Sequence, residues 1–528
     1  MGLSSTTKLV LILTPSVIFS VYFMVNRELI EALISLGVGL AVWCMLKFME
    51  KRSIKTRIDQ ALTTVIFHMY SLSLGETTPT DLIGTIAKNK EYGYYSTVFK
   101  RIQNLASHFG YGITNATSQV AKTVKPPLKD ILVRCTNTFS SVEPKGYLEI
   151  ESSMIVEEYA GYYSRSIKTM ETLGGVFTSF QSITVFLIMT LVIMTVFMID
   201  PSVIPLGYII SIVSTVLMYF LFKSSAPTEQ IVYIGKYPPK LYTCMKITAL
   251  TIIPLSTVFA YVAYVNFGAP YAFIVMGLGV IIPGIFGYLL ERHVAKIDKN
   301  YPTFLKALGE NLASTSDLKT SLAFILHMEL GPLRNLVKAA LARLKLDINH
   351  RQALETLSEE SSSYHVHMSN KILLDSMGRG ADALVIGNAL GNRVVKFLEL
   401  RKLRDVVANS FQTVVLVTQP LIVVLLTVLE VLAVFMSQYL GGLSGVSYFG
   451  FNAMPIALIQ IGNTCVILVM AVINALTVKA VSGGYWGTFF LNLGILLAIS
   501  GAVGITSRML IETALNSMPA LEMPTAIA

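Results

Sequence analysis

Nine long apolar runs constrain the fold of this chain more than any other feature. A helix needs about 18 to 20 mostly apolar residues to cross the hydrocarbon core of a bilayer. The charged fraction of 14% is also well below the roughly one quarter that is usual in soluble domains. The pattern therefore predicts an all-α polytopic membrane protein with about nine transmembrane helices. The runs are 9–25, 32–49, 176–198, 204–222, 247–265, 271–290, 412–437, 453–476 and 487–505.

The first run also fits the apolar core of a signal peptide, because Lys8 precedes it. No small-residue cleavage site follows, since the run ends in Val25-Asn26-Arg27-Glu28, and a second apolar run begins soon after. We therefore expect residues 1–52 to contain transmembrane helices 1 and 2 rather than a removable signal.

The basic residues predict which side of the membrane the two long polar regions, 53–175 and 291–411, occupy. Lys and Arg near the spans are retained on the cytoplasmic side. If both regions face the cytoplasm, all but two of the 41 Lys and Arg fall on that side, the exceptions being Arg27 and Arg508. We therefore expect a multi-pass protein of the cell membrane with a cytoplasmic N-terminus and an external tail at 508–528. Retention beside the lipid bilayer explains the net charge of +9 without a nucleic acid partner.

The order of runs repeats one plan, in which two spans, a polar region and two further spans follow one another, with span 9 as an addition. Apolar residues at helical spacing, as in 333–346 and 394–407, predict that both polar regions are helical bundles. The predicted segments are helices 1–2 (1–52), domain 1 (53–175), helices 3–4 (176–223), a linker (224–246), helices 5–6 (247–290), domain 2 (291–411), helices 7–9 (412–507) and the tail (508–528).

Two short repeated segments, or echoes, of the sequence support a parallel internal duplication. Ser179-Phe180-Gln181-Ser182-Ile183 reappears as Ser410-Phe411-Gln412-Thr413-Val414, each at the junction between a polar region and an apolar run. Residues 110–116 also align without gaps with residues 347–353, and both of these segments end in an alanine. The matching order of spans and domains is a stronger argument than either echo.

Signatures of catalysis are missing from the sequence. There is no G-x-x-x-x-G-K-[ST] phosphate loop, and the nearest glycine cluster, Gly387 to Arg393, lacks the Lys and hydroxyl that hold phosphate and Mg²⁺. Neither G-x-S-x-G nor H-E-x-x-H occurs. We therefore predict that the chain is not an enzyme and uses no cofactor.

The histidines and cysteines do not form a recognisable metal site. His365 and His367, with His350 nearby in sequence, could supply ligands, but side chains at i and i+2 point apart on a helix and no Cys lies near. The cysteines are isolated from one another, so buried thiols are expected rather than a disulfide framework or a zinc site. They are Cys44, Cys135, Cys244 and Cys465.

Few ionisable residues lie within the apolar runs. Glu430 is the clearest, and Lys47 lies where its side chain can extend to the cytoplasmic interface. Transporters usually carry ionisable groups near the membrane centre, often within inverted repeats, whereas the repeat predicted here is parallel. We therefore expect Glu430 to make an intramembrane polar contact between helices, with a secondary transporter or a membrane scaffold as the alternative functions.

The helix predicted near 392–408 is densely basic. At about 100° per residue, Arg393, Lys396 and Arg404 share one stripe. The pattern fits a solvated face retained on the cytoplasmic side, and it also fits an electrostatic docking surface for an acidic partner. The candidate docking surface consists of Arg393, Lys396, Arg401 and Arg404.

Several stretches in the second half resemble a known family. Residues 301–309, Gly331-Pro332-Leu333 and Leu400-Arg401-Lys402-Leu403-Arg404 before the second Ser-Phe-Gln motif are similar to the archaeal branch of the type II secretion F domain family. The resemblance extends over nearly the whole chain, and within that branch the chain is most similar to archaellum assembly platforms.

This resemblance implies a role and partners. It implies a membrane platform that couples a hexameric cytoplasmic secretion ATPase to the extraction and assembly of pilin-like or archaellin subunits. The ATPase would dock on the candidate surface named above, and the platform would be a homodimer. The platform of an archaeal adhesive pilus is the closest alternative within the same family.

Overall fold

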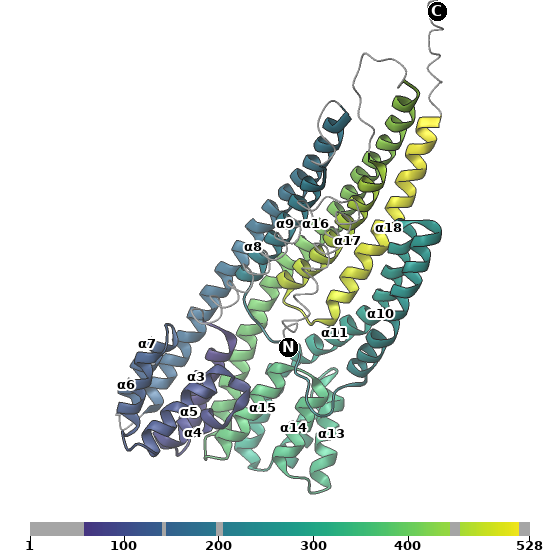
Figure 1. Cartoon of the computed structure of the whole chain (residues 1–528). Helices are drawn as coiled ribbons and strands as arrows, with labels where there is room; N and C mark the ends of the chain where they lie inside the picture. The colour runs from purple at the N-terminus through teal and green to yellow at the C-terminus, as the bar shows by residue number, and fades with distance from the viewer. Residues whose placement is uncertain (1–57, 140–143, 197–203, 444–454, 517–528) are drawn as a thin grey trace, which may run out of the picture.

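The computed structural model describes residues 58–139, 144–196, 204–443 and 455–516 (Figure 1). All regular elements within these ranges are helices, and the backbone bridge found there joins Val232 to Ser363. The all-α fold class is therefore confirmed. The predicted spans 9–25 and 32–49, Cys44 and the end of the predicted tail lie outside the described residues.

Seven helices in the described part of the chain are long and apolar enough to cross a membrane, and they coincide with the predicted runs from 176–198 to 487–505. This confirms a polytopic membrane protein. The seven are α8 (Pro144–Val196), α9 (Ile204–Ser225), α10 (Lys240–Phe267), α11 (Ala269–Thr315), α16 (Ala383–Leu443), α17 (Ile456–Ser482) and α18 (Gly487–Asn516).

Three of these helices extend without interruption from an apolar span into a polar domain. Helices α8, α11 and α16 contain 53, 47 and 61 residues. At 1.5 Å per residue they are roughly 80, 70 and 90 Å long. The predicted domain limits at 175, 290 and 411 therefore fall inside continuous helices, and the domains are joined to the spans by rods rather than by loops.

The remaining helices build two domains with the same order of elements. In each domain a first helix is followed by four short helices, and a long helix then returns to the spans. Domain 1 contains α3 (Gln60–Ser73), α4 (Pro79–Lys88), the 3₁₀ turn η1 (Lys90–Tyr92), α5 (Tyr94–Ser107), α6 (Ile113–Thr123), α7 (Leu128–Phe139) and the first part of α8. Domain 2 contains the end of α11, then α12 (Leu318–Ile325), α13 (Leu333–Lys345), α14 (His350–Ser361), α15 (Tyr364–Met377) and the first part of α16.

Backbone conformation at two turns supports this equivalence. Gly93 before α5 and Gly331 before α13, which lie one position apart in the ungapped alignment, both have φ of 53°. Gly110 and Asp347, which the ungapped alignment pairs, have φ of 69° and 60°. Left-handed backbone is rare outside Gly, Asn and Asp, so its recurrence at equivalent turns is a specific similarity.

Local caps explain where several of the short helices begin. The Asp59 carboxylate accepts a bond of 2.8 Å from the Leu62 N–H at the start of α3. Thr78 and Asp81 form a reciprocal capping box before α4. The Asp317 carboxylate accepts from the N–H groups of the first turn of α12. Each such cap stabilises its helix by about 1 kcal/mol, so these polar side chains determine where the short helices of the domains begin.

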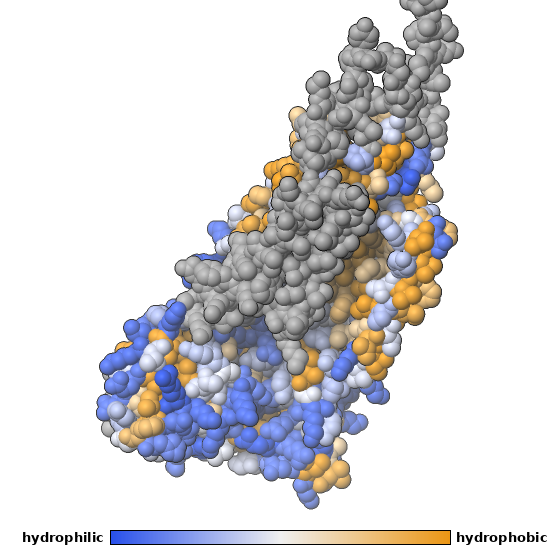
Figure 2. Space-filling view, viewed as in Figure 1, coloured by the Kyte–Doolittle hydropathy of each residue, from blue (hydrophilic) through white to orange (hydrophobic). Residues whose placement is uncertain are grey.

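Helix α16 lies at the centre of the molecule, where it packs against α8, α11, α17 and α18. The short helices gather at the lower end and the long apolar helices extend upward from them (Figure 1). Figure 2 shows hydrophilic residues over the lower end and hydrophobic residues along the upper helices. Helix α10 packs mainly on α11 and leaves large apolar side chains such as Leu250 exposed, as expected beside lipid.

The repeated Ser-Phe-Gln motif lies where the domains meet the spans. Phe411 packs against Phe177 of α8 and Phe222 of α9, with ring centroids 5.3 and 5.0 Å away. Gln181 and Gln412 each donate to an asparagine of another span, at 2.6 Å to Asn474 and 3.1 Å to Asn492. The two copies of the motif therefore make the same kind of polar clamp between helices.

Candidate functional site at the seam between the two helical domains

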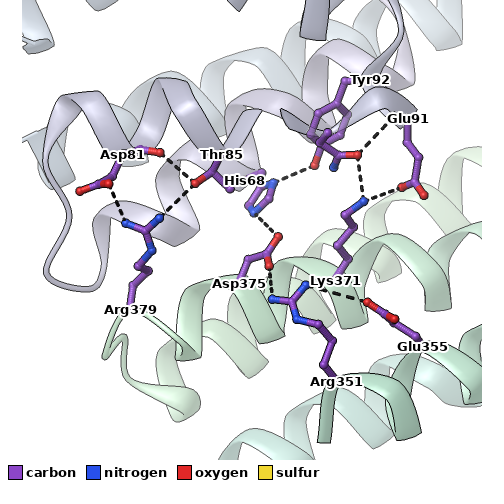
Figure 3. Close-up of polar contacts among 11 residues, drawn as sticks. His68, Asp81, Thr85, Glu91, Tyr92, Arg351, Glu355, Lys371, Asp375 and Arg379 are labelled. Atoms are coloured by element: carbon purple, nitrogen blue, oxygen red, sulfur yellow. Dashed lines mark hydrogen bonds and ion pairs between the residues drawn. The ribbon is translucent and has the colours of Figure 1, made fainter. Parts of the chain in front are cut away.

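Polar side chains join the two domains along one surface, which we call the seam (Figure 3). Domain 1 contributes α3, α4 and η1, and domain 2 contributes α14, α15 and the turn after α15. Residues of α15 and this turn that face the seam are spaced four apart in sequence, so they share one side of the helix. They are His367, Lys371, Asp375 and Arg379.

Arg379 holds the part of the seam that lies just after the end of α15. Its guanidinium lies 3.3 Å from the Asp81 carboxylate and donates to the Thr85 hydroxyl at 3.4 Å. Its carbonyl accepts a bond of 3.0 Å from the N–H of Glu76. A β-carbon on Gly75 would overlap the same carbonyl oxygen, so close contact between the backbones requires glycine there. Arg379 thus ties both its side chain and its backbone to domain 1.

Glu91 of η1 supplies the negative charge in the part of the seam that lies along α15. Its carboxylate lies 2.9 Å from His367 Nε2 and 3.0 Å from Lys371 Nζ, which also donates to Asn89. Burial opposes ionisation of Glu91, but the hydrogen bond and charge of His367 together with Lys371 bring its pKa down to about 2. The ring of Tyr233, from the segment between α9 and α10, stacks on His367 at 3.7 Å. Three parts of the chain, η1, α15 and the segment between α9 and α10, therefore meet around His367.

His68 is a neutral member of the seam. It is fully buried, and its Nδ1 is hydrogen-bonded to the Tyr92 hydroxyl at 2.8 Å. Burial lowers the pKa of His68 to about 4, although the nearby Asp375 carboxylate acts in the opposite direction. His68 Nε2 lies 3.6 Å from the Asp375 carboxylate, but a neutral ring forms no ion pair at neutral pH. The ion-pair partner of Asp375 is Arg351, at 2.6 Å.

The predicted docking surface on α16 is mostly inside the protein. Arg393, Arg401 and Arg404 are 8%, 8% and 2% exposed. Lys396 remains accessible and lies 3.1 Å from Glu157 of α8. The prediction of a surface is therefore wrong for the three arginines. A basic stripe at helical spacing predicts a solvent-exposed face only when the helix lies at the periphery of the protein. Helix α16 is instead covered on several sides.

Each buried arginine instead joins α16 to another element. Arg393 donates to the Thr64 hydroxyl of α3 at 2.6 Å and lies between the rings of Phe67 and Phe397. Arg401 lies 3.4 Å from Asp298 of α11, and that carboxylate also accepts a bond from Ser363. Burial raises the pKa of Asp298 to about 6, against the lowering effects of Ser363 and Arg401.

Arg404 lies deepest, where the domains meet the spans. Its guanidinium donates to the carbonyls of Val481, Pro227 and Ala480 at 2.8, 3.1 and 2.9 Å. It also lies 3.6 Å from Glu229, which accepts a bond of 2.8 Å from the Tyr163 hydroxyl. Arg404 therefore links α16 to the linker after α9 and to the turn between α17 and α18.

Polar contacts continue within the apolar helices. Asn474 of α17 accepts from Gln181 and donates to Gln419 at 2.7 Å, and Gln419 donates to Ser500 at 3.2 Å. This chain of bonds crosses α8, α17, α16 and α18. Glu430 lies 4.0 Å from Arg508, which places the predicted intramembrane residue at a contact between α16 and α18.

The histidines considered as metal ligands are separated. His365 is buried against Phe397, and burial lowers its pKa to about 3, whereas His367 belongs to the seam and His350 begins α14. Among the described residues, no group of three or more metal-ligating side chains is placed to hold an ion. The cysteines in the described ranges, Cys135, Cys244 and Cys465, are free thiols.

Taken together, the contacts can carry mechanical load. The seam fastens one domain to the other, and the arginines of α16 fasten both domains to the rods and to the membrane boundary. Packed helices resist deformation, so these contacts join the domains and the spans into one packed body. Sequence reasoning missed the seam because its partners come from distant segments, although the four-residue spacing on α15 was a visible signal.

Comparisons with known proteins agree with the resemblance seen in the sequence. The chain is 20% identical to flagella accessory protein J of Methanocaldococcus jannaschii over 491 residues, covering 88% of this chain and 86% of the relative. It is 22% identical to flagella accessory protein J of Methanococcus voltae over 388 residues, covering 69% and 68%. No family model and no solved structure matches the chain. The resemblance to archaellum assembly proteins is thereby confirmed.

Proposed function

We propose that this chain is the membrane platform on which an archaeal type IV pilus-like filament is assembled, with the archaellum as the favoured filament. The observation that carries the proposal is the match to two flagella accessory proteins J over most of their length. The fold supports it, because two equivalent helical domains continue directly into apolar spans through α8, α11 and α16. Such a chain suits the transfer of movement across a membrane boundary.

A separate cytoplasmic ATPase supplies the energy in this proposal. The sequence has no phosphate-binding loop of its own, so the chain acts without enzymatic activity. The ATPase pushes on the domains, the seam makes them respond as one body, and the rods pass the movement to pilin-like subunits leaving the bilayer. Load on domain 1 reaches α16 through Arg393 and Lys396, and load on domain 2 reaches it through Arg401.

The proposal includes a sidedness and an oligomeric state. Both domains lie in the cytoplasm, the C-terminus lies outside and the platform is a dimer. Cys244 offers a direct test, because it is exposed and lies at the start of α10 on the expected inner side. In a variant that keeps only this cysteine, a membrane-impermeant maleimide should label lysed cells and leave intact cells unlabelled. Equal labelling of both would reverse the orientation.

Deletion of the gene tests the function itself. Cells without the platform should lose surface filaments in electron micrographs and lose swimming, and the intact gene should restore both. Loss of surface adhesion with normal swimming would assign the platform to an adhesive pilus instead. Filaments of normal number and length in the deletion strain would refute the platform role. Retained filaments with impaired uptake of a solute would favour the transporter alternative.

A further inference from the structure

Two equivalent turns expose a large apolar side chain. Phe109, between α5 and α6, is 69% exposed, and Leu346, between α13 and α14, is 77% exposed. We call each of these two exposed residues an apex. The ungapped alignment of residues 110–116 with 347–353, extended by one position, pairs these two residues. An isolated exposed apolar residue is ordinary, but its recurrence at the same point of a duplicated fold is a specific feature.

The backbone holds both side chains in place. After Phe109 the N–H of Tyr111 bonds back to the Leu105 carbonyl at 3.4 Å, and after Leu346 the N–H of Ile348 bonds back to the Arg343 carbonyl at 3.2 Å. Left-handed residues follow each apex, as described above. Because these bonds close the end of the preceding helix, Phe109 and Leu346 project from fixed turns rather than from loose loops.

A basic face leads to the apex at Leu346. Arg334, Lys338 and Lys345 lie on α13 at positions i, i+4 and i+11, which place them on one side of the helix. All three are exposed, and none pairs with an acidic group in the described part of the chain. The positions equivalent to Lys338 and Lys345 hold Arg101 on α5 and His108 just after it, and both are also exposed.

These features lie at the end of the domains away from the spans. Helices α4, α5, α6, α13 and α14 occupy the lower end in Figure 1, opposite the upper ends of α16 and α18. His350, which follows the Leu346 turn, acts electrostatically on Asp317, just beyond the far end of α11. A bilayer around the spans therefore cannot reach the apex at Leu346, and Phe109 lies at the equivalent turn of domain 1.

We propose that the two apices, with the basic face of α13 and Arg101 of α5, form a double docking surface for the ATPase, which would meet them with an acidic surface that contains pockets. This inference rests on the proposed function and replaces the surface predicted on α16. Each apex inserts an apolar side chain into a pocket while the cations meet acidic side chains around it. Two equivalent contacts on one chain suit two neighbouring subunits of a ring.

Other occupants fit these observations less well. A second copy of this chain would bring basic faces together, which costs free energy through like-charge repulsion. Single-stranded nucleic acid binds aromatic faces by stacking of bases, whereas Leu346 at the position of Phe109 offers no such face. A pocketed protein surface accepts both a phenyl ring and an isobutyl group.

The test uses the full chain in lipid nanodiscs and the purified secretion ATPase of the same cells, with binding followed by biolayer interferometry. Phe109→Ser and Leu346→Ser should each weaken binding at least about 10-fold, and the double variant about 100-fold or more, because paired contacts reinforce each other. The triple variant Arg334→Glu, Lys338→Glu, Lys345→Glu should also weaken binding and remove most of its dependence on salt.

Matched controls separate the surface from general effects. Ile150→Ser removes an apolar residue of domain 1 that is 63% exposed but lies on α8. Lys122→Glu with Lys129→Glu reverses two exposed cations on α6 and α7. Both controls should bind the ATPase like the unaltered chain. All variants should retain their helical circular dichroism and elution volume, since the altered side chains are exposed.

The outcomes distinguish this inference from the proposed function. If the unaltered platform fails to bind the ATPase, both the proposed coupling to the ATPase and the proposed docking surface are refuted. If the platform binds and the apex variants bind equally well, the docking surface alone is refuted. Apex variants that change self-association, or binding of a labelled oligonucleotide, while leaving ATPase binding intact would also overturn it.

Discussion

The guanidinium of Arg404 lies directly against Gly483, the residue that ends α17. Gly483 has φ of 67°, and a β-carbon there would overlap the central carbon of the guanidinium. The same arginine donates to the carbonyls of Val481 and Ala480, so the turn and the side chain fix each other. This pair joins α16, the rod of domain 2, to the last two spans.

Gly483→Ala should therefore be strongly destabilising. The left-handed backbone alone costs an alanine about 1 kcal/mol, and displacement of a buried arginine from its carbonyls raises the total to roughly 2–4 kcal/mol. Thermal unfolding of the purified platform in detergent measures the loss. Gly175→Ala is the matched control, because no atom lies within 4 Å of the point that a β-carbon would occupy there in α8, and it should be neutral or slightly stabilising. Equal effects of the two substitutions would contradict the assigned contact.

The sequence predicts the spans well and the interior of the domains poorly, for physical reasons. A bilayer requires a run of apolar residues with internally bonded backbone, so runs such as 204–222 can be read directly. The side of a helix that meets water depends on which other helices cover it. Arg401 and Arg404 follow a pattern typical of solvated faces, yet inside the protein Arg401 pairs with Asp298, and Arg404 donates to carbonyls in the last turn of α17.

The seam shows a second limit of prediction. Its cations and anions on α15 recur every four residues, which indicates a polar face but not what covers it. The partners Asp81 and Glu91 come from the other domain, nearly three hundred residues earlier in the chain. Pairings over such distances leave no trace in local periodicity, whereas the exposed apices could be found once the duplication had aligned Phe109 with Leu346.

Glu91→Gln should loosen the seam. The substitution removes the charge that holds Lys371 and His367, and the loss should amount to roughly 1–2 kcal/mol, since hydrogen bonds to charged groups are the stronger ones. Amide hydrogen exchange should accelerate in η1 and α15. Glu355→Gln is the control, because that side chain is 53% exposed and lies 3.9 Å from Arg351, so exchange there should be unchanged. Unaltered protection of α15 in the Glu91 variant would rule out a stabilising seam.

Mild acid should weaken the same region through His68. Its pKa is about 4 in the folded protein against 6.5 for an ordinary histidine, mainly because it is buried. Between these values the unfolded chain binds the extra proton and the folded chain does not, so stability falls as pH falls from 6.5 to 4. The groups that act on His68 are Asp375, Lys371 and Arg393, and only the first favours its protonation.

The magnitude follows from about 1.4 kcal/mol per pKa unit, which gives up to about 3 kcal/mol of His68-linked stability lost by pH 4. The measurement is the free energy of unfolding at pH 7 and pH 4 for the unaltered chain and for His68→Gln. The variant should lose less stability on acidification than the unaltered chain. Identical losses in the two proteins would show that His68 does not titrate between these pH values.

The amide contacts within the spans predict unequal roles for two asparagines. Asn474 is fully buried and bonds both Gln181 and Gln419, whereas Asn492 accepts one bond from Gln412. Asn474→Leu should cost about 1–2 kcal/mol, because two buried amides lose a partner, and Asn492→Leu about half as much. Replacing Gln181 and Gln419 by Leu together with Asn474 should restore part of the loss, since no unpaired amide remains. Unfolding in mixed micelles measures all three variants, and a triple variant less stable than Asn474→Leu would show that the amide chain does not stabilise the bundle in this way.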